Sequence, residues 1–410
     1  MMTSQDLINT LPNNADWAVR AVEIMLQAAI ESGASDLHIL CQKDRVVARG
    51  RRDCGLFAIC EIPLERRDLL IGRLKALSGL AAFIHNEPQD GRIEWPEDIK
   101  GEPRAGKPKS ASATAKAGPA RMLRVSFLPT INGQNVVIRF PESAAEEMAL
   151  DGLGMPPEVH AGICGLLARQ EGTILLTGPS SSGKTTTMYA MLRHLYAAHG
   201  DRLNFVTIED PVECNLGFAA QVQINEAQDL TFGRALRASL RQDPNILMIG
   251  EIRDEETAIT AIQAGMTGHL VISTLHAGRA ARVFTRLLSM GIASYLVASA
   301  LSGSVAQRLA RVLCAKCRRP APPDTGGGFI AVGCDECGGT GYQRRAGLFE
   351  LVLVTEHLRE LILARATADQ IAAEASHSQI GDLTRKARSL CEIGAISRAE
   401  LEFLAAGTSD

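Results

Sequence analysis

Short apolar runs recur along the second half of the chain, and segments with helical spacing of apolar residues separate them. Four of these runs have the length of buried strands. They are residues 173–177, 203–208, 246–249 and 270–274. After the first run, Met188, Met191, Leu192 and Leu195 recur at helical spacing until Gly200. Strands that alternate with helices in this way predict a parallel sheet with helices on both faces.

The first 141 residues combine helical and strand patterns. Apolar residues from Val19 to Ile30 lie on one face of a helix that Asp16 can cap and Gly33 ends. A second amphipathic helix is predicted over residues 64–80. A turn is predicted at residues 53–55, and strands at 34–40, 46–52, 88–95 (after an initial turn), 122–128 and 135–140. We therefore expect one α+β domain over residues 1–141.

Two segments lack the pattern of a packed element. Residues 101–120 contain Pro, Gly, Ser, Ala and Lys but no large apolar group, which predicts a flexible surface loop. Its Arg104, Lys107, Lys109 and Lys116 could contact anionic lipid or an acidic partner, although linker composition alone explains them. Residues 142–157 are polar with Gly and Pro and are expected to link the domains, so that the second domain spans residues 158–410.

The composition indicates a globular chain of two to three domains, with 410 residues of which 46% are hydrophobic and 22% charged. A net charge of −3 gives no basic footprint, so nucleic-acid binding is not expected. We expect a cytoplasmic location, because no apolar run has membrane-spanning length and the polar N-terminus lacks a signal peptide. The ten cysteines should then stay reduced. Six of them are scattered and are expected to fill core or surface positions: Cys41, Cys54, Cys60, Cys164, Cys214 and Cys391.

A glycine-rich turn joins the first apolar run to the helix that follows it. Residues 178–185 match the phosphate-binding pattern G-x-x-x-x-G-K-[ST] without a mismatch, in the strand–turn–helix context that this pattern requires. Glycines let the backbone turn tightly, so that N–H groups and a helix N-terminus face the anion. Lys184 is predicted to contact the β- and γ-phosphates of ATP, and the Thr185 hydroxyl to hold Mg²⁺. The predicted nucleotide-binding residues are Gly178, Pro179, Ser180, Ser181, Ser182, Gly183, Lys184, Thr185 and Thr186.

Polar residues follow the other three apolar runs, at the sheet edge where parallel sheets bind ligands. Phosphoryl transfer needs a metal holder, a group that orients the attacking water and positive charge on the phosphate. Glu251 is predicted to hold Mg²⁺ directly or through water, and Glu209 to polarise the water with support from Asp210. His276 is a candidate sensor of the γ-phosphate. Each residue also has a structural interpretation, because acidic residues after strands often cap the next helix.

Arg237 and Arg241 are four residues apart in FGRALRASLRQDP, so they share one face of the predicted helix, and Arg234 lies one turn earlier. Two interpretations are open on this pattern alone. The arginines either clamp phosphate groups or form an ordinary solvated helix surface.

Four cysteines form two C-x-x-C pairs with sixteen residues between the pairs. They are Cys314, Cys317, Cys334 and Cys337. This spacing predicts a structural Zn²⁺ site, in which four thiolates close the coordination sphere and leave no catalytic position. A zinc module can bind nucleic acid or fold a small protrusion, and the absence of a wider basic run favours folding.

Motifs spread over residues 34–355 closely resemble the type II secretion and type IV pilus assembly ATPases, the GspE/PulE/PilB group of secretion NTPases. The matching pieces are ASDLH (34–38), SGL to PQDGR (78–92), RVSFLPT to VVIRF (124–140), GPSSSGKTTT, TIEDPVE (207–213), LRASLRQDPNILMIGEIRD (236–254), AGMTGHLVISTLHA (264–277), QRLARVLCAKC (307–317) and GCDECGGTGY (334–342). The phosphate-binding turn alone would be far less specific than this set.

The resemblance implies a homo-hexameric motor with a RecA-like P-loop ATPase domain and a smaller, PAS-like N-terminal α+β domain that rotates on nucleotide binding. It also implies an inner-membrane platform protein as partner, and peripheral association with that membrane. By position, Glu209 matches the catalytic acidic residue, Glu251 the Walker-B residue and His276 the second histidine of the His box. Arg124 and Arg139 match arginines that reach the nucleotide from the N-terminal domain, and Arg237 and Arg241 match those between the two boxes. The zinc module, residues 311–345, resembles that of assembly-type members and precedes a C-terminal helical region over 348–406.

The chain departs from the family pattern at Gln134-Asn135, at Asn245 and in the short segment before residue 15. The favoured function is an ATP hydrolase that powers pilin or pseudopilin assembly. A retraction or DNA-transfer motor and a non-hydrolysing nucleotide-binding scaffold are the alternatives. The zinc cysteines argue against retraction, the charge balance argues against DNA transfer, and the intact Lys184, Glu209 and Glu251 argue against a scaffold.

Overall fold

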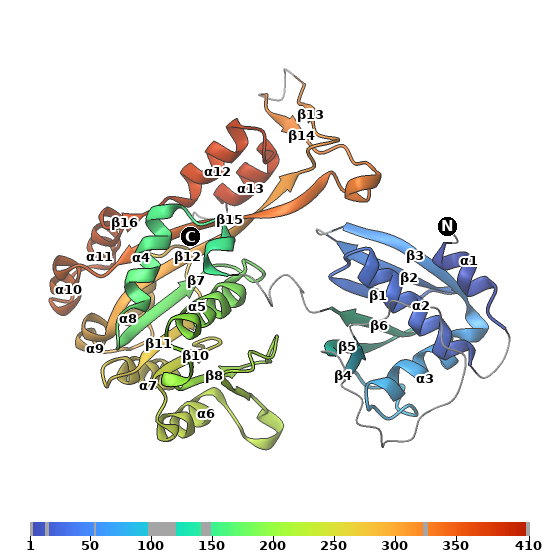
Figure 1. Ribbon diagram of the computed structural model, residues 1–410, viewed down its shortest axis with the longest axis horizontal. Coiled ribbons are helices and arrows are strands. Elements are labelled where there is room, and N and C mark those ends of the chain that lie inside the picture. Colours follow the sequence, from blue (N-terminus) through green and yellow to red (C-terminus); the bar gives the residue numbers. More distant parts are fainter. Residues whose placement is uncertain are drawn as a thin grey trace. The chain divides into compact units, whose positions relative to one another are not determined.

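The computed structural model describes residues 3–12, 16–52, 55–96, 120–140, 149–322 and 327–406. The chain divides into two compact units, residues 1–143 and 144–410 (Figure 1). Residues 101–119 of the predicted loop, with its four cationic residues, lie outside the described residues, as do Cys54 and residues 142–148 of the predicted linker.

The first unit is an antiparallel sheet with helices packed on one face. The strand order is β3-β2-β1-β6-β5-β4. The strands are β1 (Asp36–Cys41), β2 (Arg45–Arg52), β3 (Gly55–Pro63), β4 (Gln89–Pro96), β5 (Ala120–Thr130) and β6 (Gly133–Arg139). The helices are α1 (Ser4–Asn9), α2 (Trp17–Glu31) and α3 (Arg67–Leu77). Apolar residues of all three helices and of the strands form one buried cluster, which makes this unit an α+β fold.

Most predicted elements of this unit are confirmed, with three differences. The α3 helix is shorter than the predicted 64–80 segment, because a 3₁₀ turn at Leu64–Arg66 precedes it. Asp16 occupies the N-cap position of α2, but its side chain makes no capping hydrogen bond there. Strand β3 was not predicted, because Phe57, Ile59 and the other apolar residues of this edge strand show no clean alternation with polar ones.

A row of charged residues crosses the sheet on the face opposite to the helices. Asp36 in β1 lies directly opposite Arg139 in β6, which lies opposite Arg124 in β5. Arg51 in β2 and Arg92 in β4 extend the row on its two sides. Asp36 is buried and accepts a 2.9 Å bond from Arg139 Nε, and its other oxygen lies 4.0 Å from Arg51 Nε. One carboxylate therefore balances charge within a row of four arginines.

We expect Asp36→Asn to lower the free energy of unfolding by about 1–2 kcal/mol, less than for a fully buried pair because Arg139 is exposed to water. The substitution removes the only carboxylate of the row and leaves the arginines to repel one another. Urea unfolding followed by circular dichroism measures the change. Asp44→Asn, in the exposed turn after β1, is the matched control. Equal stability of the two variants would contradict the electrostatic account of the row.

The second unit is built on an eight-stranded sheet of order β16-β15-β12-β7-β11-β10-β8-β9. The strands from β12 to β9 run parallel, and β15 and β16 are added antiparallel at one edge. The parallel strands are β7 (Gly172–Thr177), β8 (Phe205–Glu209), β9 (Ala220–Gln223), β10 (Ile246–Ile249), β11 (Leu270–Thr274) and β12 (Leu301–Leu313). The antiparallel ones are β15 (Tyr342–Leu353) and β16 (Gln379–Ile380), and a separate ribbon pairs β13 (Arg319–Pro320) with β14 (Phe329–Ile330).

Helices cover both faces of this sheet, as predicted. Successive strand residues point to opposite faces, and Leu175 belongs to one buried cluster while its neighbours Ile174 and Leu176 belong to another. The first face carries α6 (Phe232–Ser239), α7 (Glu255–Gly265), α8 (Arg282–Ser289) and α9 (Ser294–Ala300), and the second carries α4 (Pro157–Leu167) and α5 (Lys184–His199). Within the described residues, no helix is both long and apolar enough to span a bilayer.

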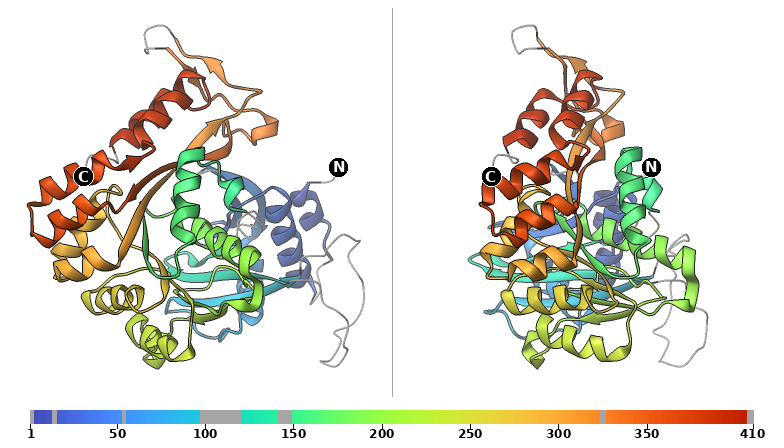
Figure 2. Two further views of the ribbon diagram at one scale, coloured as in Figure 1. Left: turned by 60° about the vertical axis from the view of Figure 1, so that its left-hand side comes forward. Right: turned by 90° about the vertical axis from the view of Figure 1, so that its left-hand side faces the viewer.

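The C-terminal part differs from the predicted helical region over 348–406, because β15 extends to Leu353 and pairs along its whole length with β12. The helices that follow are α10 (Glu356–Leu363), α11 (Ala368–His377), α12 (Leu383–Glu392) and α13 (Arg398–Ala406). Helices α11 to α13 lie along the β12–β15 ribbon (Figure 2). This ribbon carries the β13–β14 protrusion at its far end (Figure 1).

Candidate functional site

The glycine-rich turn between β7 and α5 has the geometry of a phosphate-binding loop. Gly178 has a φ of 147°, and a Cβ atom there would lie 2.3 Å from the Gln307 carbonyl oxygen. Gly183, with a φ of 84°, directly precedes the first turn of α5. Lys184 Nζ donates 2.8 Å hydrogen bonds to the carbonyl oxygens of Gly178 and Pro179. A helix N-terminus and an ammonium group therefore lie together, and the residues present fit phosphate groups.

The ends of β8, β10 and β11 meet this loop at a cavity of about 180 Å³. Seven of the predicted site residues line it: Ser180, Lys184, Thr185, Glu209, Asp210, Glu251 and His276. Burial lowers the pKa of Lys184 more than the nearby Glu251 raises it. Of the remaining predicted residues, Gly178, Pro179, Ser181, Ser182 and Gly183 form the turn itself, and Thr186 lies in the first turn of α5. Residues from four separate segments of the sequence thus come together in one cleft.

The Glu251 carboxylate is already engaged by two neighbours. Oε1 pairs with Arg253, whose guanidinium also lies 3.9 Å from Asp210 Oδ2, and Oε2 lies 3.6 Å from His276 Nε2. Thr185 and Glu251 offer a hydroxyl and a carboxylate in the same cavity, and oxygen ligands of this kind fit Mg²⁺. Arg253 pairs with one of the Glu251 oxygens in this arrangement, so a metal bound at that oxygen would share it with the guanidinium.

The loop that carries His276 is held by hydrogen bonds at the residues that follow this histidine. The Ala277 N–H donates to the Thr177 hydroxyl at 2.8 Å, and that hydroxyl donates back to the Ala277 carbonyl at 2.5 Å. Farther along, the buried Glu350 of β15 accepts bonds from the Ala280 N–H at 3.1 Å and from Arg279 at 3.0 Å. The imidazole itself stays exposed at the cavity.

The predicted arginines do not line this cavity. Arg237 in α6 pairs with Glu256, and Arg234 pairs with Asp229. Arg241 lies beyond α6, in a 3₁₀ turn at Leu240–Gln242, and donates to the Arg237 carbonyl at 2.9 Å. The predicted helix therefore ends before Arg241 and does not contain both arginines. Arg124 and Arg139 belong to the first unit, in the charged row described above.

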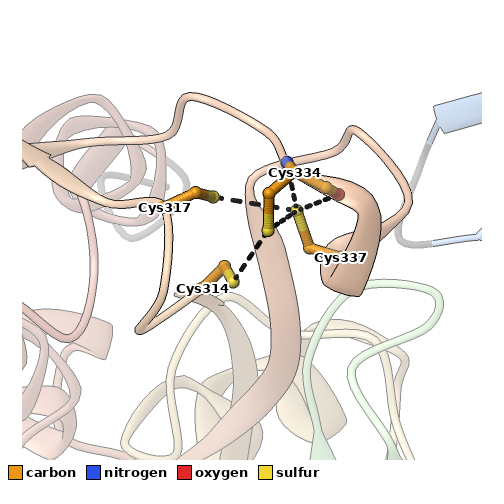
Figure 3. A group of neighbouring side chains, drawn as sticks. All are labelled: Cys314, Cys317, Cys334 and Cys337. Atoms are coloured by element: carbon orange, nitrogen blue, oxygen red, sulfur yellow. Dashed lines mark hydrogen bonds between the residues drawn. The ribbon is translucent and has the colours of Figure 1, made fainter.

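The four predicted zinc ligands converge at the end of the β12–β15 ribbon, and their side chains point toward one another (Figure 3). Three of the Sγ–Sγ distances are 3.9 Å (Cys314–Cys334), 3.8 Å (Cys317–Cys337) and 3.7 Å (Cys334–Cys337). A tetrahedral Zn–S bond of about 2.3 Å requires about 3.8 Å between sulfur atoms, so the residues fit zinc.

Backbone donors around these sulfurs favour thiolates. The N–H groups of Gly333 and Gly341 donate to Cys317 Sγ and Cys337 Sγ at 3.3 and 3.1 Å. Burial by itself raises the pKa of the Cys337 thiol, but bonds from the N–H groups of Cys334 and Gly341 outweigh it and lower that pKa to about 6. A thiolate is the form that binds zinc.

Comparison with known sequences identifies the family. Residues 104–402 match the family described as "Type II/IV secretion system protein". The chain belongs to this family. It is 40% identical over 373 residues to the type II secretion system protein HxcR of Pseudomonas aeruginosa, with 91% of this chain and 73% of that protein covered. It is 38% identical over 381 residues to the type II secretion system ATPase E of Vibrio cholerae, covering 88% and 71%, and 38% identical over 380 residues to the type IV pilus assembly ATPase PilB of Pseudomonas aeruginosa, covering 89% and 63%. The predicted family, that of the secretion and pilus ATPases, is therefore confirmed.

Comparison with solved structures supports the same fold. The Legionella pneumophila ATPase DotB matches with a TM-score of 0.68 and 20% identity, covering 94% of this chain and 95% of DotB. The pilus retraction motor PilT with bound ADP matches with a TM-score of 0.62 and 23% identity, covering 93% and 95%. These likenesses confirm the predicted α/β ATPase fold with its smaller N-terminal α+β unit.

Some residues of the secretion-family site had no predicted role. Arg253 lies in the GEIRD motif (residues 250–254), and its position two residues after Glu251 is the sequence feature that could have indicated a contact with that carboxylate. Tyr189 was given no role because it lies among the regularly spaced apolar residues of α5. A buried tyrosine hydroxyl nevertheless requires a hydrogen-bond partner. That partner is Glu209, which lies twenty residues away in the sequence.

Proposed function

We propose that this chain is an ATP hydrolase, a motor that powers the assembly of pilin or pseudopilin subunits in a pilus or secretion system. The observation that carries the proposal is the cavity where Lys184, Glu209 and Glu251 meet. A phosphate-binding loop, a carboxylate for a metal and a second carboxylate for water are the parts that phosphoryl transfer needs. Family membership supports the same class of reaction.

In the proposed reaction each residue has a distinct role. The loop from Gly178 to Thr186 holds the phosphates, with Lys184 on the β- and γ-phosphates. Thr185 and Glu251 hold Mg²⁺, which when bound neutralises charge on these phosphates. Glu209 accepts a proton of the attacking water while the water oxygen bonds to the γ-phosphorus. The bond between that phosphorus and the bridging oxygen breaks, and ADP leaves with the electron pair of this bond. His276, which lies 3.6 Å from Glu251, would sense the γ-phosphate.

We further propose a homo-hexamer that works in the cytoplasm against an inner-membrane platform protein. The exposed Arg237 and Arg241 and the N-terminal Arg124 and Arg139 would supply positive charge to the transferring phosphate, which couples its loss to domain rotation. The relatives named as secretion and pilus-assembly ATPases support this assignment. Zn²⁺ on the four cysteines would fold the protrusion and take no part in hydrolysis.

We expect Lys184→Ala to lower ATP hydrolysis by about a hundredfold or more, because one charged donor to the transition state is lost. Steady-state phosphate release measures the effect on the purified chain. Lys386→Ala, at an exposed position of α12, is the matched control. Normal hydrolysis by Lys184→Ala would overturn the proposed function. Stimulation of the wild-type rate by DNA would favour a DNA-transfer motor instead, whereas co-purification with the platform protein would support assembly.

A further inference from the structure

We propose that Tyr189 is a positioning residue for hydrolysis. Its hydroxyl holds one oxygen of the Glu209 carboxylate and leaves that oxygen a single acceptor site for the attacking water. This inference rests on the proposed function, because it refines how the same cavity activates water. It concerns a residue that touches neither phosphate nor metal in that scheme and that acts through Glu209.

Among the described residues, three donors from three different elements hold the Glu209 carboxylate. Glu209 ends β8 and is 2% exposed. Its Oε1 accepts from the Thr207 hydroxyl at 2.5 Å and from the Gln221 amide of β9 at 3.1 Å. Its Oε2 accepts from the Tyr189 hydroxyl of α5. These bonds fix the plane of the carboxylate at the end of the sheet.

The number of donors decides what the carboxylate can still do. A carboxylate has about four acceptor sites, two on each oxygen. Thr207 and Gln221 fill both sites on Oε1, and Tyr189 fills one on Oε2. Glu209 also lines the cavity that contains Lys184. The one remaining site, on Oε2, is therefore the site that can accept a proton from water, and Tyr189 is the donor that shares this oxygen.

Tyr189 is well held for such a role. Its side chain is 1% exposed, and its hydroxyl also accepts the Glu213 N–H at 3.2 Å. The Arg193 guanidinium lies 6.0 Å from the centre of its ring. Burial raises the pKa of Tyr189, and the Glu209 carboxylate raises it further, so the hydroxyl keeps its proton and stays a donor.

The position of Tyr189 on α5 links the orientation of the Glu209 carboxylate to the position of the phosphate-binding loop. The same helix begins at Lys184, so the phosphate-binding residues and the hydroxyl that orients Glu209 belong to one rigid element. A shift of α5 relative to β8 would move the phosphates and release Glu209 together. The geometry thus ties the direction of the attacking water to the place where the phosphates are held.

The test is Tyr189→Phe, which keeps the ring and removes only the hydroxyl. We expect kcat for ATP hydrolysis to fall about tenfold while KM for ATP changes less than about twofold, because misorientation of a catalytic group slows chemistry more than binding. Tyr196→Phe is the matched control, since its hydroxyl lies on the same helix but bonds the exposed Asp201 at 3.1 Å. We expect that control to hydrolyse ATP at the wild-type rate.

A double-mutant cycle separates positioning from structural damage. If Tyr189 acts through Glu209, Tyr189→Phe costs nothing further in a Glu209→Gln background, where residual hydrolysis is measured in single turnovers. The same tenfold fall in both backgrounds, or an unchanged kcat in the wild-type background, would overturn the proposal. Should Tyr189→Phe unfold, Thr207→Val removes a donor to Oε1 and must show the same loss of effect in the Glu209→Gln background. Failure of the proposed function is distinct, because the wild-type chain itself would then not hydrolyse ATP.

Discussion

Glu209→Gln is expected to lower kcat for ATP hydrolysis by about 10²- to 10⁴-fold, the range that a positioned general base contributes. The substitution preserves the size of the side chain but removes the group that accepts the proton of the attacking water. Lys184 and the loop from Gly178 remain intact, so nucleotide affinity should change little. Steady-state phosphate release gives kcat, and titration with a fluorescent ATP analogue gives affinity.

The local hydrogen bonds sharpen this expectation. In the described structure the Glu209 carboxylate has three hydrogen-bond partners, and each of them is a donor: Tyr189, Thr207 and Gln221. An amide in its place presents an NH₂ group to at least one donor, so a modest loss of stability should accompany the loss of activity. Glu158→Gln, at an exposed position in the first turn of α4, controls for a change of charge. A Glu209→Gln variant that hydrolyses ATP as fast as this control would rule out Glu209 as the base.

The sheet of the second unit shows which strands the pattern of apolar residues predicts and which it does not. The predicted runs 246–249 and 270–274 coincide with β10 and β11, because these central strands consist almost entirely of apolar residues. Strand β12 was not predicted, although it is the longest of the sheet, because buried polar residues interrupt its apolar pattern. Ser304 donates to the Ala280 carbonyl, and Gln307 accepts from Thr187. Such polar positions are satisfied only by partners that the local sequence does not reveal.

The candidate site likewise contains residues that the sequence pattern predicts and residues that it does not. Lys184, Glu209 and Glu251 could be predicted because each follows a recognisable strand, and the ends of parallel strands meet at one edge of a sheet. Arg253 and Tyr189 could not be assigned in this way, since their roles depend on side-chain contacts that the sequence pattern does not show. Arg253 pairs with Glu251, and Tyr189 with Glu209. Motifs therefore identify the groups that touch ligands, whereas the groups that orient them follow from three-dimensional contacts.

The described part of the protrusion at the end of the β12–β15 ribbon has no apolar core of its own. Among the described residues 314–322 and 327–340, the buried side chains are Cys314 and Cys337, two of the four expected zinc ligands. Structural zinc contributes about 10–16 kcal/mol of apparent binding free energy in small zinc-dependent folds, far more than the few apolar contacts available here. We therefore expect the metal to determine whether this segment is folded.

Cys337→Ser is accordingly expected to reduce bound zinc from about one ion per chain to less than about a tenth of that after dialysis against a chelator, since a three-thiolate site is open. Amide hydrogen exchange should accelerate in residues 314–341 and remain unchanged in β7 and α5, because β7 pairs with residues 301–306 of β12, whereas the protrusion begins after Leu313 at the end of that strand. Cys164→Ser, a half-buried cysteine of α4 outside the cluster, is the matched control and should leave zinc content unaltered. Full zinc occupancy in Cys337→Ser, or a wild-type chain without zinc, would contradict the four-thiolate site. Accelerated exchange that reached β7 would instead mean that the metal stabilises the sheet itself through β12 and β15.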